Sequence, residues 1–230
     1  MIRGITFDFG GTIVTGGLQK DAFQQALLDY LNSLGYVGGE MELKTVMRRM
    51  LISLTRVRHQ NREMRLEDLY TGVLCSFGID PEREVLDHIH HLYTRFFKTE
   101  VISGVEQIFQ ILKVHFSLAI ISNAMSDVPR YTLKKAGLDA YFKSIVLSRD
   151  LGVRKPDSEI FNFTLFNLGI TNHDAIHVGD SMEQDVQGAQ NAGMKAIWIM
   201  GEKANRHVKP DYIIKSIEEL PLLLEASFWD

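Results

Sequence analysis

Asp8 stands between a short apolar segment, residues 5–7, and the glycine pair Gly10-Gly11. An aspartate in this position would project from the carboxyl end of a strand, where α/β enzymes hold their reactive groups. The glycines would let backbone N–H groups, including that of Gly11, approach an anion. An aspartate before two glycines is by itself more often a turn residue, but this arrangement also suits a nucleophile that attacks a phosphoryl group.

Two later segments offer groups that could hold the same phosphoryl group. Ser122 and Asn123 end the apolar segment 118–121 with a hydroxyl and an amide, both able to hydrogen-bond a phosphoryl oxygen. The alternative for this pair is a simple turn or helix cap. Lys155 precedes Pro156, where a helix is expected to begin. An ammonium group there would neutralise both a carboxylate nucleophile and a transferring phosphoryl group.

A fourth segment, residues 175–185, leads from an apolar strand into a glycine and two carboxylates, Asp180 and Asp185. Taken singly, Asp180 could cap a helix and Asp185 could interact with the dipole of its first turn. Together, beside a phosphate, they favour Mg²⁺, because this ion prefers oxygen ligands and the substrate completes its octahedral shell.

Strand and helix patterns alternate from residue 102 onward, which predicts an α/β fold with a Rossmann-like parallel sheet covered by helices on both faces. The predicted strands are residues 117–122, 144–148, 175–178, 195–199 and 211–214, and the predicted helices are residues 105–115, 126–137, 157–169 and 183–193. The first strand must belong to the same sheet. Because ligands of such sheets bind at the carboxyl ends of the strands, this fold would bring Asp8 and the three later segments together.

The long segment 19–98 contains no convincing strand. Its apolar residues recur at helical spacing, as at Phe23 and Leu27, after which three further helices are predicted over residues 42–60, 66–77 and 82–98. We therefore predict two parts, an α/β core of residues 1–15 and 100–230 and an all-helical cap of residues 16–99.

With the four segments in this order, the chain resembles the haloacid dehalogenase-like hydrolase superfamily, in particular members with a helical cap between the first and second motifs. The resemblance implies that Asp8 is the nucleophile, and that Ser122 and Lys155 hold the phosphoryl group and the aspartyl intermediate. It also implies that Asp180 and Asp185 organise Mg²⁺, with Asp8 as a further direct ligand.

Gly10 departs from the pattern of the family's phosphatases, which carry a second aspartate two residues after the nucleophile. That aspartate protonates the leaving group and later activates water, and general acid–base assistance is typically worth about a hundred- to ten-thousand-fold. The family's metal ligand at this position is usually the backbone carbonyl, which Gly10 keeps. We expect none of Thr15, Asp21, His59 or Asp127 to replace the missing acid.

Three functions follow from the resemblance. The first is a weak Mg²⁺-dependent phosphatase acting on a small phosphorylated or otherwise anionic metabolite, which Lys155-Pro156 favours because it resembles the phosphatase version of the third motif. The second is cleavage of a phosphonate or a haloacid. The phosphonate reaction needs a cap lysine, for which the candidates are Lys44 and, at the entrance to the cap, Lys20. The dehalogenases lack the metal-binding aspartate present here as Asp180. The third is a non-catalytic protein that binds phosphate or a partner.

The composition excludes several other classes. Of 230 residues, 45% are hydrophobic and 23% charged, with a net charge of -4, so we expect no general attraction to nucleic acid or to an anionic membrane. No apolar run approaches the length of a membrane span, and no signal-like segment opens the chain. We expect a cytoplasmic protein that is a monomer or a homodimer. The terminal pair Phe228-Trp229 is interpreted as an anchor or a dimer contact.

Three other features of the helical segment have simpler interpretations. The basic residues are Arg48, Arg49, Arg56, Arg58, Arg62 and Arg65, with His59. They could steer an anionic substrate, but a solvated helix face paired with Glu63, Glu67 and Asp68 is favoured. Cys75 lies among apolar residues and is expected to be a buried thiol. His88, His90 and His91 are expected to pack rather than to bind a metal.

Overall fold

The computed structural model describes residues 1–201 and 207–228, with the side chains of residues 1–201 and 207–226. Six parallel strands form one sheet in the order β5-β4-β1-β6-β7-β8. The strands are β1 (Gly4–Phe7), β4 (Ser117–Ser122), β5 (Ser144–Leu147), β6 (Ala175–Gly179), β7 (Lys195–Ile199) and β8 (Tyr212–Ile214). The predicted α/β class with a Rossmann-like parallel sheet is confirmed.

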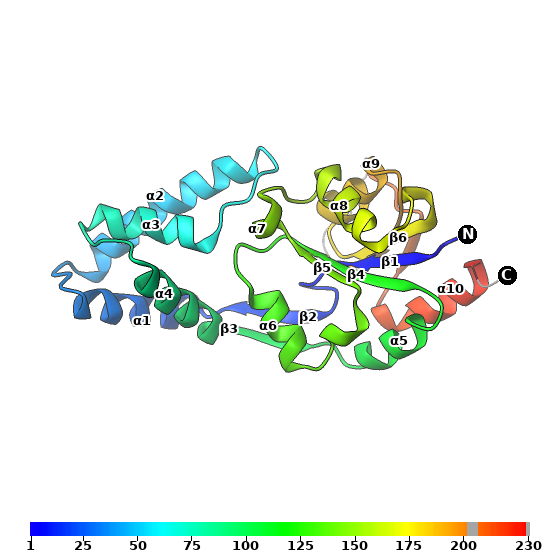
Figure 1. Cartoon of the computed structure of the whole chain (residues 1–230), viewed down its shortest axis with the longest axis horizontal. Coiled ribbons are helices and arrows are strands. Elements are labelled where there is room, and N and C mark those ends of the chain that lie inside the picture. Colours follow the sequence, from blue (N-terminus) through cyan, green and yellow to red (C-terminus); the bar gives the residue numbers. More distant parts are fainter. Residues whose placement is uncertain (202–206, 229–230) are drawn as a thin grey trace.

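Helices cover both faces of this sheet, as predicted (Figure 1). One face packs against α5 (Val105–Leu112) and α10 (Leu220–Phe228), and the other packs against α8 (Ser158–Leu168) and α9 (Gly188–Asn191). The central strands β1, β4 and β6 are almost fully buried, which is why their sequences are continuous apolar runs rather than alternating ones. These three strands therefore form a rigid platform at the centre of the molecule.

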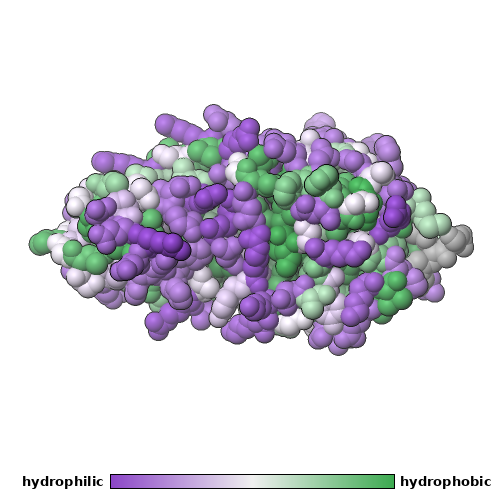
Figure 2. All heavy atoms as spheres, viewed as in Figure 1, coloured by the Kyte–Doolittle hydropathy of each residue, from purple (hydrophilic) through white to green (hydrophobic). Residues whose placement is uncertain are grey.

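A helical bundle extends from one end of the sheet (Figure 1). Its helices are α1 (Lys20–Ser33), α2 (Glu40–Arg58), α3 (Leu66–Ser76) and α4 (Arg83–Phe96), and they enclose a hydrophobic cluster separate from the two clusters on the sheet. The face of the bundle seen in Figure 2 is mostly hydrophilic, in keeping with an apolar interior. Each part of a core-and-cap protein needs a hydrophobic cluster of its own, and the bundle and the sheet have separate clusters. The boundaries at residues 15/16 and 99/100 stay a prediction.

A short antiparallel ribbon, β2 (Val14–Leu18) and β3 (Phe97–Val101), joins the bundle to the sheet. Neither strand was predicted from the sequence, in which the last bundle helix was expected to extend to residue 98. At Gly16, φ is +109° and an added Cβ would lie 2.2 Å from the carbonyl oxygen of Lys98, so the close approach of the strands requires glycine. Such pairing between distant segments has no local sequence signal.

The helix predicted over residues 183–193 is also different in the structure. A π-helical turn, Met182–Gln187, precedes α9, and such turns often occur at functional sites. Gly188 packs so closely on Phe161 that an added Cβ would lie 2.8 Å from the ring, so this position requires glycine.

Several smaller expectations have clear outcomes. Cys75 is exposed, so the prediction of a buried thiol is wrong. The histidines do pack: His88 stacks on Tyr30 with ring centroids 3.9 Å apart, and His90 Nδ1 lies 2.9 Å from Glu67 Oε1. The Phe228-Trp229 pair lies outside the residues whose side chains are described. In the part of the chain that the structure describes, no helix is both long and apolar enough to cross a membrane.

A smaller set of connecting elements completes the molecule. The α-helices α6 (Val128–Lys135) and α7 (Ser148–Leu151) follow β4 and β5, and short 3₁₀ turns occupy Asp139–Tyr141, Asn172–Asp174 and Ile217–Glu219. Helices α6 and α7 lie near the ribbon and the bundle (Figure 1). Helix α6 contributes Val128 and Pro129 to the lining of the cavity near Asp8.

Candidate active site

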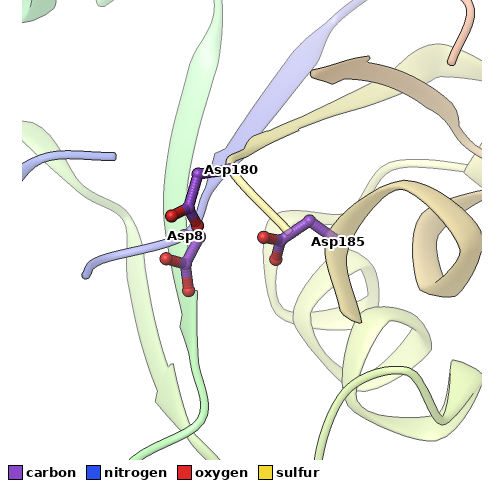
Figure 3. Close-up of side chains that lie close together, drawn as sticks. All are labelled: Asp8, Asp180 and Asp185. Carbon is purple, nitrogen blue, oxygen red and sulfur yellow. The ribbon is translucent and has the colours of Figure 1, made fainter. Parts of the chain in front are cut away.

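Three aspartates meet at the carboxyl edge of the sheet (Figure 3). Asp8 follows β1, Asp180 follows β6, and Asp185 projects from the π-helical turn. Each offers a carboxylate oxygen, and these oxygens all lie within 4.8 Å of one another. The pairing of β1 with β6, in which Phe7 is opposite Val178, accounts for the proximity of Asp8 and Asp180. A cluster of oxygen donors of this kind suits a hard divalent cation.

Lys155 lies between two of these carboxylates. Its Nζ donates to Asp8 Oδ1 at 2.6 Å and to Asp185 Oδ1 at 2.6 Å, and the lysine is only 1% exposed. Burial alone would lower the pKa of Lys155, but the charges of Asp185 and Asp8 outweigh burial and raise that pKa above its usual value. The raised pKa favours the charged form of Lys155, so an ammonium group lies beside Asp8 as the sequence predicts.

The two carboxylates that share this lysine have pKa values shifted in opposite directions. Burial raises the pKa of Asp8 to about 7, with the charges of Asp185 and Asp180 adding to the effect while Lys155 opposes it. Burial acts in the same direction on Asp185, but Lys155 and His177 hold the pKa of that group far below its usual range. Asp185 is therefore a fixed negative charge, whereas the charge of Asp8 responds to its surroundings.

Asp185 is also fixed in position. Besides Lys155, it accepts the backbone N–H of Ser181 at 2.9 Å and lies 3.1 Å from His177 Nε2. The other ring nitrogen of His177 lies 2.7 Å from Thr6 Oγ1, and burial lowers the pKa of this histidine. His177 was not predicted as a site residue. Its position in an apolar strand, eight residues before Asp185, is the sequence feature that could have identified it.

Asn123 has a different role from the one predicted. Its side-chain amide donates to the carbonyl of Lys155 at 3.0 Å and to Gln184 Oε1 at 2.9 Å, and its side-chain oxygen accepts the N–H of Lys155 at 2.8 Å. The side chain therefore positions Lys155 and has no donor left for a phosphoryl oxygen. Ser122, at the end of β4, is buried and lines the same cavity as Asp8, where its hydroxyl can face a phosphoryl group.

The glycine turn also differs in detail from the prediction. The N–H of Gly11 donates to the carbonyl of Val14 at 2.7 Å, so it is not the anion-binding amide. The N–H groups of Phe9 and Gly10 make no hydrogen bond to any described residue, and both residues line the cavity. Gly11 is required for another reason: φ is +80°, and an added Cβ would lie 2.2 Å from Asp180 Oδ2.

A cavity of about 390 Å³ opens above Asp8. Among its described lining residues, the titratable groups are Asp8, Asp180, Asp185, Arg58 and Tyr93. Arg58 and Tyr93 come from the bundle and were not predicted as site residues. Among the described lining residues, none outside the aspartate cluster carries a carboxyl group that could take the place of the acid missing at Gly10.

Other residues considered from the sequence lie elsewhere. Asp127 pairs with Arg130 at 2.9 Å and with Arg149 at 2.8 Å and does not line this cavity, as expected. Lys44 pairs with Glu40 at 2.5 Å on the surface of α2 and is not among the lining residues either. Neither Lys44 nor Lys20, the candidates for the imine-forming lysine of phosphonate cleavage, is therefore among the described residues that line this cavity.

The sequence of this chain matches the model of one protein family. Residues 5–199 match the family described as haloacid dehalogenase-like hydrolase. The chain belongs to this family. The matched region includes all of the residues described above, from Asp8 to Asp185, so the family assignment covers the whole site of this haloacid dehalogenase-like hydrolase.

Individual relatives are more distant. The putative HAD-hydrolase YfnB of Bacillus subtilis (strain 168) is 29% identical over 66% of this chain and 65% of its own. A 2-haloacid dehalogenase from Pseudomonas syringae pv. Tomato DC3000 is 27% identical over 98% of this chain and 99% of its own, with a TM-score of 0.78. A HAD phosphatase from Thermococcus onnurineus is 26% identical over 97% and 98%, with a TM-score of 0.67. The chain spans 65%, 33% and 55% of the first three curated relatives it matches.

Proposed function

We propose that this chain is a Mg²⁺-dependent hydrolase of phosphatase type, which acts on a small phosphorylated substrate through an aspartyl intermediate on Asp8. The observation that supports this most directly is the position of Lys155, whose Nζ lies 2.6 Å from both Asp8 and Asp185 beneath the cavity. A buried ammonium group there stabilises a nucleophilic carboxylate and the phosphoryl group that it attacks. The HAD phosphatase among the structural relatives agrees with this activity.

The residues at the carboxyl edge fit a magnesium ion. Asp8 and Asp180 would hold it together with the backbone carbonyl of Gly10, while Asp185, fixed by Lys155 and the Ser181 N–H, would complete the negative surroundings. Mg²⁺ takes few protein ligands and fills its shell with water and substrate oxygens. When bound, the ion would supply positive charge that offsets the charge of the phosphoryl group.

The reaction would have two displacements. A carboxylate oxygen of Asp8 attacks phosphorus in line, the bond to the leaving oxygen breaks, and that oxygen keeps the electron pair. Water then attacks the aspartyl phosphate, releasing inorganic phosphate and restoring Asp8. Lys155, the Ser122 hydroxyl and the free N–H groups of the turn hold the phosphoryl oxygens in both steps. Since no acid occupies position 10, the leaving oxygen takes its proton from water.

The first test is hydrolysis of p-nitrophenyl phosphate, whose leaving group needs little protonation. We expect phosphate release that requires Mg²⁺ and stops when a chelator is added. Chelator-resistant release of halide from a 2-haloacid, without phosphate release, would instead assign the activity of the dehalogenase relative. Binding of a phosphate analogue with Mg²⁺ but no turnover of either substrate would indicate the non-catalytic alternative.

Mg²⁺ binding is expected to strengthen as the pH rises from 6 to 8. The pKa of Asp8 is raised to about 7, so below that pH a proton competes with the ion for this carboxylate. The dissociation constant for Mg²⁺ should fall about tenfold between pH 6 and pH 8, with most of the change below pH 7, and change little above pH 8. Titration calorimetry at several pH values measures it, and an equally steep dependence in Asp8→Asn would show that another group titrates.

Gly10→Asp is expected to improve turnover of alkyl phosphate esters. The substitution has room, because a Cβ at Gly10 would meet no described atom within 4 Å and the backbone there is not left-handed. A carboxylic acid beside the leaving oxygen should raise kcat on an alkyl phosphate by about a hundredfold or more, with less effect on p-nitrophenyl phosphate. Gly10→Asn is the matched control, since it fills the same space without an ionisable proton. An equal gain in both variants would contradict the acid–base explanation.

A further inference from the structure

Arg58 brings a positive charge from the bundle into the cavity above Asp8. It is at the carboxyl end of α2 and lines the cavity together with Asp8 and Asp180. Its Nε donates to Glu63 Oε1 at 3.1 Å, whereas its two terminal nitrogens donate to no described residue. With the side chain 33% exposed, these nitrogens are available to a molecule in the cavity.

Glu63 holds Arg58 at the junction of the bundle and the sheet domain. Its side chain is fully buried, and its second oxygen accepts the hydroxyl of Ser148 at 2.9 Å and lies 3.9 Å from Arg154 Nε. Backbone bonds reinforce the junction: the N–H of Glu63 donates to the carbonyl of Gly152 at 2.9 Å. The guanidinium groups of Arg58 and Arg154 share this one carboxylate, which leaves the three groups with one net positive charge, and of the two arginines Arg58 lines the cavity.

The bundle and β3 contribute a part of the cavity wall that carries no carboxylate. The bundle contributes Arg58 and the phenol ring of Tyr93, and β3 contributes Phe97 and Thr99. None of these four residues carries a negative charge, so a substrate ammonium group would find no anionic partner among them. A carboxylate would meet a guanidinium group able to bind it with two parallel hydrogen bonds.

We propose that Arg58 is the specificity-determining residue of this site and selects substrates whose leaving portion carries a carboxylate. The proposal rests on the proposed function, because it places the phosphoryl group at Asp8 and the remainder of the substrate toward the bundle. A cavity of about 390 Å³ accommodates a phosphoryl group and a short carboxylate-bearing chain. Glu63 acts as a positioning residue that keeps the guanidinium group over the site.

The activity test uses three aryl phosphates that differ in one substituent: phenyl phosphate, 3-carboxyphenyl phosphate and 3-(aminomethyl)phenyl phosphate. Wild type should prefer the carboxylate in kcat/KM and accept the ammonium substrate least. In Arg58→Gln, the ratio of kcat/KM for the carboxylate over phenyl phosphate should fall about 10- to 100-fold, which is the worth of a charge-assisted hydrogen bond. Arg56→Gln, which changes an exposed arginine on the same helix outside the cavity, should keep the wild-type ratio. An unchanged ratio in Arg58→Gln would overturn the proposal.

A binding test separates this proposal from the proposed function. Calorimetry with Mg²⁺ compares butylphosphonate with phosphonoacetate, 3-phosphonopropionate and 4-phosphonobutyrate, none of which needs turnover. At least one carboxylate compound should bind wild type about tenfold or more tightly than butylphosphonate, and Arg58→Gln should lose this preference. If wild type hydrolyses no phosphate ester but shows the preference, the function fails and the role of Arg58 stands. If it hydrolyses phenyl phosphate but shows no preference in either test, the role of Arg58 fails alone.

Discussion

Asp8→Asn is expected to abolish hydrolysis of p-nitrophenyl phosphate, with a loss on the order of 10⁴-fold or more. An amide cannot form the aspartyl intermediate, although its oxygen can still accept the hydrogen bond from Lys155. The fold should remain stable. Burial raises the pKa of Asp8 to about 7, so above that pH the folded protein bears a charged group that it disfavours, and the neutral amide removes this cost.

Two measurements accompany the activity assay for this variant. The melting temperature at pH 8 without Mg²⁺ should stay within a few degrees of wild type, and the increase caused by Mg²⁺ should be largely lost. Asp29→Asn, at an exposed position of α1, is the matched control and should keep both activity and the Mg²⁺ effect. Substantial hydrolysis by Asp8→Asn would mean that another group is the nucleophile.

Lys155→Met is expected to inactivate the protein and to lower its free energy of unfolding by about 3–5 kcal/mol at pH 8, the usual cost of removing one partner of a buried ion pair. Lys155 is the cation shared by Asp8 and Asp185, and methionine fills similar space without a charge. At pH 5.5 the loss should be smaller, since Asp8 can then take up a proton in the folded state. The cost therefore rises with pH, which urea denaturation at the two pH values measures.

Two further variants test whether the loss of charge, rather than a change in packing, destabilises Lys155→Met. Lys143→Met removes an exposed lysine that donates to Ser117 and should change the unfolding free energy by well under 1 kcal/mol, as is usual for surface substitutions. Adding Asp8→Asn to Lys155→Met removes one of the unpaired carboxylates and should restore part of the stability. A pH-independent loss, or no recovery in the double variant, would show that packing rather than charge accounts for the effect.

The sheet was predictable from the sequence because its central strands β1, β4 and β6 are almost fully buried and therefore mostly apolar. The runs before Asp8, Ser122 and Asp180 also identified the edge at which the reactive groups meet, since parallel strands place their carboxyl ends together. The ribbon β2–β3 was not predictable in this way. Its first strand contains Gly16 and Gly17, and its second follows α4 without a break, so its stability comes from pairing across about eighty residues of intervening chain.

The types of the site residues were predictable, but their partners were not. Asn123 was correctly placed beside the site, yet only the structure shows that its amide is occupied by the backbone of Lys155. Arg58 was interpreted as part of a solvated helix face paired with Glu63. The pairing is confirmed, but Glu63 is buried and Arg58 lines the cavity. The burial of Glu63 and the position of Arg58 depend on how the end of α2 packs against the sheet domain. The periodicity of α2 alone does not specify this packing.

The ribbon β2–β3 has a consequence for how this family can diversify. Its five paired positions, from Val14 opposite Val101 to Leu18 opposite Phe97, hold the two ends of the bundle segment side by side. A segment whose ends are adjacent can be exchanged for another of different length without moving the strands on either side. The reactive residues all lie outside it, whereas Arg58 and Tyr93 lie within it. Recombination at the ribbon would therefore change which molecule is recognised in a single genetic event while conserving the chemistry performed on it.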